Sequence, residues 1–248
     1  MNGIRAIFFD LGGTLFSNRQ IPVVCMPVLE EAARRLGVEG GFGGIGSAFI
    51  DATRQTNEDF LKRPYYLHRD LFIGTARRLL AALGREPSEE FCEWFYEAQR
   101  EVMVGQLELR ADCLETLGAL RSRGLQLAIV SNIDDDFLEP MLDHLALRPY
   151  FEHCISSEAA RSCKPDAGIF RHALQRAGCG REEVLFVGDS RIHDIQGARG
   201  AGIRSVLIVE EGGVSHLDDE DFAVEPDHVI GELSELLQIR AVAEGEGE

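Results

Sequence analysis

The stretch Ile7-Phe8-Phe9-Asp10-Leu11-Gly12-Gly13-Thr14-Leu15 decides the fold. A mostly apolar run that starts at Ile4 ends at the carboxylate of Asp10, and two glycines and a threonine soon follow. A short apolar run before a glycine-rich turn predicts a buried strand that leads into a tight loop. In an open α/β sheet, ligands bind just beyond the carboxyl ends of the strands, where Asp10 would stand. Its carboxylate could serve as a nucleophile, as a ligand of a hard cation, or only as the cap of a turn.

The composition indicates a globular protein with a sizeable core, because 45% of its 248 residues are hydrophobic and 27% are charged. The formal net charge is −17, so we expect neither nucleic acid nor an anionic membrane as a partner. We expect no signal peptide, because the chain opens on a strand, and no apolar run approaches the roughly 18 residues of a membrane span. The six cysteines form no C-x-x-C pair. These features predict a cytoplasmic protein with reduced cysteines, as a monomer or a homodimer.

Strands alternate with helices at the start of the chain and again from about residue 108 onward. The expected strands cover residues 4–9, 125–130, 153–156, 184–187, 204–209 and 228–230. This alternation predicts an α/β fold, a Rossmann-like parallel sheet sandwiched by helices.

Between the first strand and residue 108 the pattern is helical throughout. Four amphipathic stretches predict helices over residues 26–36, 47–61, 67–83 and 88–104, with a glycine-rich loop over 40–46. Helices of this number can bury a core of their own, so we expect a small all-helical domain inserted into the α/β domain. The expected α/β core covers 1–16 and 108–240, the helical domain 17–107, and a disordered acidic tail 241–248.

Polar residues follow three further strands at the points where those strands end. They are Ser131 with Asn132, Lys164 after the short third strand, and Asp189 with Asp194. The carboxyl ends of parallel strands meet at one edge of the sheet, so these side chains could converge on Asp10. Taken singly, each has an ordinary structural explanation, as a helix cap, a turn residue or a solvated lysine.

Taken together and in this order, the four stretches resemble the motifs of the haloacid dehalogenase-like (HAD) hydrolase superfamily. The matching segments are Asp10-Leu11-Gly12-Gly13-Thr14, Ser131, Lys164-Pro165-Asp166, and Gly188-Asp189-Ser190 with Asp194. The resemblance covers about residues 4–237, and the helical insertion stands where that family places its smaller cap domain.

The resemblance implies a Mg²⁺-dependent phosphatase that acts on a small phosphorylated metabolite. Asp10 would be the nucleophile and form an aspartyl phosphate, and Lys164 would pair with Asp10 or Asp189. The implied Mg²⁺ ligands are Asp10, the carbonyl of Gly12, Asp189 and Asp194, the last as a support of the metal or its waters. The implied substrate-binding residues are Thr14, Ser131, Asn132 and Lys164.

One position departs from the family pattern. Its phosphatases usually carry a second aspartate two residues after the nucleophile, as general acid and base, and Gly12 stands there instead. Four explanations stay open: a phosphatase that uses another acid or a bound water, a carbon–halogen or carbon–phosphorus hydrolase, a catalytically silent phosphate or protein binder, or an altered residue in an active enzyme. Candidate replacement acids are Glu58, His68 and His193. The cap residues most able to recognise a polar substrate are Arg54, Arg63, Tyr65, Tyr66, His68 and Arg69.

Overall fold

The structure is a computed structural model that describes residues 3–210 and 224–243. It divides into two compact units, the first made of Met1–Asn18 and Glu108–Glu248 and the second of Arg19–Leu107. Within the described residues, no helix is both long enough and apolar enough to cross a membrane.

The first unit is built on a parallel sheet with the strand order β3-β2-β1-β4-β5-β6. The strands are β1 Ala6–Phe9, β2 Gln126–Ser131, β3 His153–Ser156, β4 Val184–Gly188, β5 Arg204–Ile208 and β6 His228–Ile230. Phe9 lies beside Ile129 of β2 and Val187 of β4, so the three central strands end within about two residues of one another. The residues that follow them therefore meet at one edge of the sheet.

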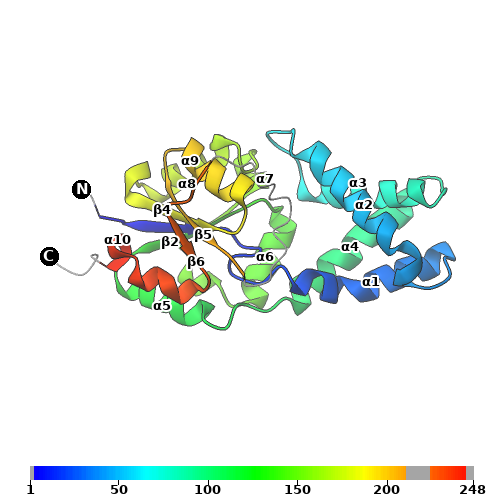
Figure 1. Ribbon diagram of the computed structural model, residues 1–248, viewed down its shortest axis with the longest axis horizontal. Helices are drawn as coiled ribbons and strands as arrows, with labels where there is room; N and C mark the ends of the chain where they lie inside the picture. Colours follow the sequence, from blue (N-terminus) through cyan, green and yellow to red (C-terminus); the bar gives the residue numbers. More distant parts are fainter. Residues whose placement is uncertain (1–2, 211–223, 244–248) are drawn as a thin grey trace. The chain divides into compact units, whose positions relative to one another are not determined.

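Helices cover both faces of this sheet (Figure 1). Along the chain they are α5 Cys113–Ser122, α6 Asp135–His144, η1 Arg148–Tyr150, α7 Ser157–Ala160, α8 Ala167–Ala177, η2 Arg181–Glu183, η3 Arg191–Gln196, α9 Gly197–Gly200, η4 Leu233–Gln238 and α10 Arg240–Ala243. Helices α8 and α9 lie on one face, and α5 and α10 on the other. The predicted fold class, a Rossmann-like parallel sheet between helices, is confirmed.

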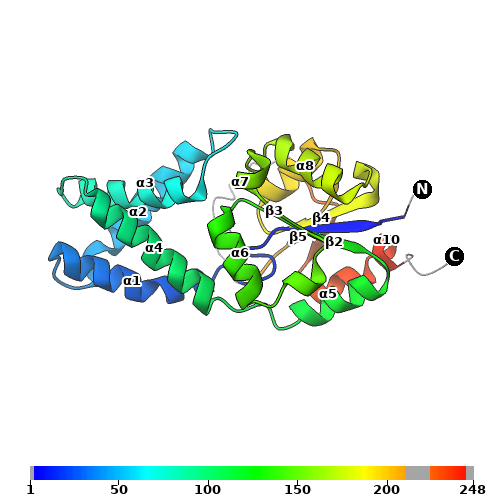
Figure 2. The ribbon, with the colours of Figure 1, turned by 180° about the vertical axis from the view of Figure 1, so that it is seen from behind.

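The second unit consists of four helices, with all of residues 19–107 described: α1 Gln20–Leu36, α2 Phe42–Phe60, α3 His68–Ala82 and α4 Glu89–Gln106. Each helix packs against two others, α1 and α3 both contacting α2 and α4 (Figure 2). The centre of this bundle is apolar, with Ile45, Leu79 and Phe95 fully buried. Ser88 caps α4, because its hydroxyl accepts a hydrogen bond from the amide of Phe91.

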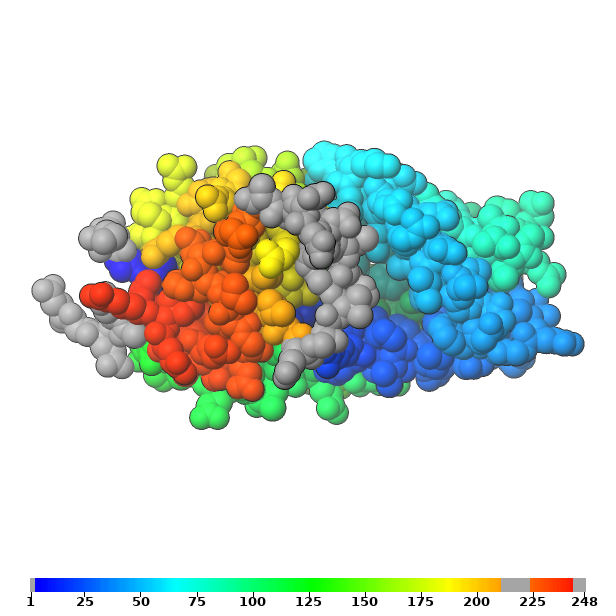
Figure 3. All heavy atoms as spheres, viewed as in Figure 1, coloured from blue at the N-terminus to red at the C-terminus, as the bar shows by residue number. Residues whose placement is uncertain are grey.

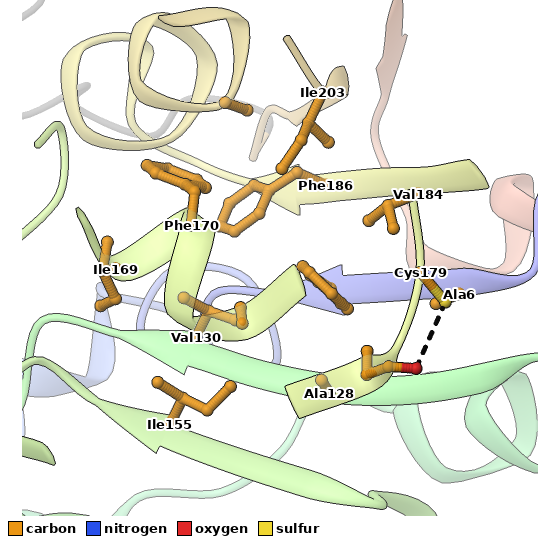
Figure 4. Close-up of a cluster of buried hydrophobic side chains, with 14 residues drawn as sticks. Ala6, Ala128, Val130, Ile155, Ile169, Phe170, Cys179, Val184, Phe186 and Ile203 are labelled. Carbon is orange, nitrogen blue, oxygen red and sulfur yellow. Dashed lines mark hydrogen bonds between the residues drawn. The ribbon is translucent and has the colours of Figure 1, made fainter. Parts of the chain in front are cut away.

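One part of the core of the first unit lies between the sheet and α8. Side chains from β1, β4 and α8 form one apolar cluster, in which Phe170 of α8 meets Phe186 of β4 edge to face at 5.2 Å (Figure 4). The last strand and the helical turns after it lie at the surface of this unit, orange to red in Figure 3. The packed core makes the sheet a rigid base for the residues at its carboxyl edge.

Three expectations about the elements are wrong. Helix α2 begins at Phe42, inside the stretch 40–46 that we expected to be a loop, because Ile45 is buried in the bundle. The segment from Asp194 is not one regular helix, since a π-helical turn, η3, comes before α9. The expected disordered tail does not begin at residue 241, because α10 runs to Ala243. The rest of that tail, residues 244–248, lies outside the described residues.

Candidate active site

The carboxyl edge of the sheet brings together the acidic and basic residues that the motifs contain. Asp10 follows β1, Ser131 is the last residue of β2, and Asp189 follows β4. Lys164 lies between α7 and α8, and Asp194 lies in η3. Carboxylate oxygens of Asp10, Asp189 and Asp194 lie within 4.8 Å of one another.

Lys164 links two of these carboxylates. Its ammonium Nζ donates to Oδ1 of Asp10 and to Oδ1 of Asp194, both at 2.6 Å. The Ser131 hydroxyl donates to the same oxygen of Asp10 at 2.9 Å. The expectation that Lys164 pairs with Asp10 or Asp189 is therefore right for Asp10, whereas its second partner is Asp194. Lys164 is buried, so the network is held in a region of low dielectric where such contacts are strong.

Asn132 fixes the backbone of Lys164. Its side-chain amide donates to the Lys164 carbonyl oxygen at 2.9 Å, and its Oδ1 accepts from the Lys164 amide at 2.7 Å. This pair of hydrogen bonds orients the lysine toward Asp10. The substrate contact that we expected of Asn132 stays a prediction, and its two observed contacts give it a supporting part in the cluster.

The two glycines after Asp10 differ in what their surroundings allow. A Cβ on Gly13 would lie 2.0 Å from Oδ2 of Asp189, and the backbone φ of Gly13 is +76°, so this position requires glycine. A Cβ on Gly12 would meet its nearest atoms, Oδ1 of Asn18 and Cζ of Phe16, at 3.5 Å, which is an ordinary contact distance. The backbone thus tolerates a side chain at Gly12, and glycine there is not imposed by sterics.

Burial and mutual repulsion raise the pKa values of two acidic groups of the cluster. Burial, and then the carboxylates of Asp194 and Asp10, raise the pKa of Asp189 to about 8. Burial also raises the pKa of Asp194 to about 6, against the opposing effect of the Lys164 ammonium. Burial alone would lower the pKa of Lys164, but the two carboxylates that it contacts outweigh burial and raise it. Three carboxylates facing one ammonium leave negative charge uncompensated.

This donor set fits a hard divalent cation. Mg²⁺ binds carboxylate and carbonyl oxygens, and a charge of +2 would balance the excess of two carboxylates over the one lysine. The raised pKa of Asp189 has the same cause, because a buried carboxyl group beside other carboxylates is stabilised either by a proton or by a cation. The described residues that could hold such an ion are Asp10, Asp189 and Asp194.

Two residues of the site were missed from the sequence. Asn18 donates from Nδ2 to Oδ2 of Asp189 at 2.9 Å. Arg110 donates from Nε to the carbonyl oxygen of Thr14 at 3.0 Å and from Nη2 to that of Gly13 at 2.7 Å. Both lie where the chain passes between the two units, and no motif marks them.

The remaining candidates are placed as follows. The Thr14 side chain is fully buried, and its hydroxyl has no hydrogen-bond partner within residues 3–210 and 224–243, so its expected substrate contact stays a prediction. His193 lies in η3, where its ring Nδ1 is 3.2 Å from the Ser190 hydroxyl, and burial, followed by the Lys164 ammonium, lowers the pKa of His193 to about 4. Glu58 and His68 belong to the second unit, where Glu58 pairs with Arg54.

The other cap candidates also make contacts within the second unit. Arg63 stacks over the ring of Phe60, with its guanidinium carbon 4.1 Å from the ring centroid. Tyr66 meets the same ring edge to face at 5.0 Å, and Arg69 forms an ion pair with Glu93. Arg63, Tyr66 and Arg69 thus have structural contacts of their own, and the expected substrate contacts of the cap candidates stay predictions.

Comparison with known proteins shows which family the chain belongs to. A family description of haloacid dehalogenase-like hydrolases matches residues 4–202, and the chain therefore belongs to the HAD-like hydrolases. This confirms the resemblance read from the four motifs. It also makes the protein a hydrolase by family.

Individual relatives carry more than one kind of name. The chain is 42% identical over 123 residues to mouse haloacid dehalogenase-like hydrolase domain-containing protein 3, covering 49% of this chain and 47% of that protein. It thus spans about half the length of that curated relative. It is 34% identical to a Pseudomonas putida phosphoglycolate phosphatase, covering 94% of this chain and 78% of the relative. It is 26% identical to a (S)-2-haloacid dehalogenase of a Pseudomonas species, covering 100% and 99%.

Among solved structures, the HAD-hydrolase YfnB of Bacillus subtilis, bound to magnesium, is similar in fold. The TM-score is 0.76 at 18% identity, and the match covers 96% of this chain and 99% of that one. At this identity the likeness concerns the fold alone.

Proposed function

We propose that the protein is a Mg²⁺-dependent phosphatase of small phosphorylated metabolites that works through a phosphoryl group carried on Asp10. The observation that carries the proposal is the placement of Asp10: Ser131 and Lys164 both bond to one of its oxygens, and two further carboxylates lie within 4.8 Å. The relatives named phosphoglycolate phosphatase support the same reaction class.

In the first step, a carboxylate oxygen of Asp10 attacks phosphorus. A new oxygen–phosphorus bond forms, and the bond between phosphorus and the leaving oxygen breaks, with its electron pair going to the leaving group. In the second step, water attacks the same phosphorus and gives its proton to solvent. The bond to Asp10 then breaks, which regenerates the carboxylate and releases inorganic phosphate.

The residues around Asp10 would stabilise the charge on the transferring group. The Lys164 ammonium and the Ser131 hydroxyl, which both contact Asp10, are within reach of a phosphoryl group bonded to it, and they orient the nucleophile. Asp10, the Gly12 carbonyl and Asp189 would hold Mg²⁺, with Asp194 in support. The bound Mg²⁺ would offset the negative charge that otherwise keeps a carboxylate away from a phosphate. We assign substrate-binding roles to Ser131 and Lys164, with Thr14 and Asn132 in the surrounding shell.

Gly12 limits which substrates turn over quickly. General acid–base assistance is typically worth about 10²–10⁴-fold in rate, and glycine supplies none. Substrates whose leaving group departs as a stable anion, such as acyl and aryl phosphates, need this assistance least. We therefore expect acetyl phosphate and p-nitrophenyl phosphate to be hydrolysed faster than alkyl phosphates.

Hydrolysis of acetyl phosphate and p-nitrophenyl phosphate with and without Mg²⁺ tests the proposal. We expect Mg²⁺-dependent release of phosphate that disappears in Asp10→Asn, a change that keeps the size of the side chain and removes the nucleophile. Asp143→Asn is a matched control, because Asp143 is an exposed carboxylate near the end of α6 that pairs with Arg148 at the surface. Unchanged turnover in Asp10→Asn would show that Asp10 is not the nucleophile.

The second candidate is a catalytically silent protein that binds phosphate groups, and Gly12 is the observation that favours it. Such a protein would bind Mg²⁺ and inorganic phosphate but release no product from either ester. Carbon–halogen cleavage, the chemistry named for one relative, would instead release halide from a 2-haloacid. The acidic pair Asp189 and Asp194 disfavours that reading, because with Asp10 it could hold a cation.

A further inference from the structure

Asn18 and Asp189 are 171 residues apart in the sequence, yet their side chains are hydrogen-bonded at 2.9 Å. The nitrogen of the Asn18 amide donates this bond to Oδ2 of Asp189, and the amide oxygen faces elsewhere. That oxygen lies 3.5 Å from the point where a Cβ of Gly12 would stand. Asn18 thus lies against both the acidic cluster and the residue that departs from the family pattern.

Asp189 depends on this contact more than its neighbours depend on theirs. Asp10 accepts from both Ser131 and Lys164, and Asp194 accepts from Lys164 and from the backbone amide of Ser190. For Asp189, the Asn18 amide is the one hydrogen bond from another side chain in the described part of the chain. Without it, no hydrogen bond from another side chain in the described part of the chain would orient the Asp189 carboxylate.

We propose that Asn18 is a positioning residue for cation binding: it holds the Asp189 carboxylate in one orientation and fills the space beside Gly12. This inference rests on the Mg²⁺ site of the proposed function. Residues that hydrogen-bond a metal ligand fix its orientation, and changing them typically lowers metal affinity by about 10–100-fold.

Asn18 lies at the point where the chain leaves the first unit. It is the last residue of the N-terminal segment of the first unit, and Arg19 begins the second unit. The preceding residue, Ser17, donates to the carboxylate of Glu210 at 2.7 Å, beyond the end of β5. The segment that leads into the second unit is therefore tied to two neighbouring strand ends, and the bond from Asn18 reaches the acidic cluster.

Calorimetric titration with Mg²⁺ alone tests the inference without any turnover. The variants are Asn18→Ala, Asn18→Ser and, as the matched control, Ser17→Ala, which removes a similar hydrogen bond to a carboxylate outside the cluster. We expect Mg²⁺ affinity to fall by about 10–100-fold in both Asn18 variants and by less than about twofold in Ser17→Ala. The serine hydroxyl, on a shorter side chain, does not span the distance to Asp189.

Thermal unfolding of each variant in the absence of Mg²⁺ separates a loss of affinity from a loss of fold. Asn18→Ser is the second variant in case Asn18→Ala does not fold. Normal affinity in both folded Asn18 variants would overturn the inference and leave the proposed function standing. Equal losses in Ser17→Ala would also overturn it, because the effect would then belong to the segment as a whole. No Mg²⁺ binding by the unaltered protein would overturn both the inference and the proposed cation site.

Discussion

Gly12→Asp adds the carboxylate that the family's phosphatases usually carry two residues after the nucleophile. The structure accepts a Cβ at this position, since the Cβ would meet its nearest neighbours, Asn18 and Phe16, at 3.5 Å, and the backbone there is not left-handed. We therefore expect the backbone to accept the change, and the main effect should be the chemical one. Nearby carboxylates would raise the pKa of the new group, which favours the protonated form that a general acid needs.

The expected gain for alkyl phosphates is about 10²–10⁴-fold in kcat/KM, the usual contribution of general acid–base catalysis. This corresponds to about 3–5 kcal/mol of transition-state stabilisation, at about 1.4 kcal/mol for each factor of ten. For acyl phosphates, whose leaving group departs as a carboxylate, the gain should be much smaller. The difference between the two substrate classes is the signature of a proton transfer.

The assay is a series of phosphate esters that differ in the pKa of the leaving group. For the unaltered protein, log(kcat/KM) should fall steeply as that pKa rises, and Gly12→Asp should flatten the slope. Gly13→Ala is the contrasting variant, because its Cβ would lie 2.0 Å from Asp189 and its activity and stability should fall. An equal gain for every ester, or no gain in a folded Gly12→Asp variant that binds Mg²⁺, would refute the reasoning.

Two further predictions concern the loop and the acidic cluster. Arg110→Ala removes two hydrogen bonds to backbone carbonyls of the loop after Asp10 and should lower the free energy of unfolding by about 2–3 kcal/mol. Arg110→Lys should lose less. Equal stability of the unaltered protein and both variants in urea would contradict this. The pKa values of Asp194 and Asp189, raised to about 6 and about 8, mean that protonation favours the folded metal-free protein at low pH and that this contribution is lost as the pH rises through those values. The thermal stabilisation by Mg²⁺ over EDTA should therefore grow from about pH 5 to about pH 8, and a stabilisation independent of pH would count against the cluster as the cation site.

The residues at the sheet edge could be predicted because each is marked by the sequence immediately before it. Asp10, Ser131 and Asp189 each stand at the end of an apolar run, and a parallel sheet brings such ends together whatever the rest of the chain does. Lys164 was predicted from its motif, and its contact with Asp10 follows from the same convergence. These features need no knowledge of side-chain packing.

The missed features depend on contacts between distant segments. Nothing near Asn18 in the sequence indicates Asp189, and nothing near Arg110 indicates the carbonyl groups that it binds 96 and 97 residues earlier. The sequence does not distinguish Gly12 from Gly13, and the close approach of Asp189 shows that Gly13 must be glycine. The start of α2 in a glycine-rich stretch likewise follows from tertiary packing, which overrides weak helix propensity.

The central claim is that Asp10 carries the phosphoryl group during turnover, and trapping that group is the most direct test. The protein is mixed with acetyl phosphate and Mg²⁺, quenched in acid within the first turnover, digested and analysed by mass spectrometry. If Asp10 is the nucleophile, the peptide that contains it gains the mass of one phosphoryl group, the label needs Mg²⁺, and Asp10→Asn abolishes the label. Phosphate release with no label on Asp10, or a label that persists in Asp10→Asn, would show that Asp10 does not carry the phosphoryl group.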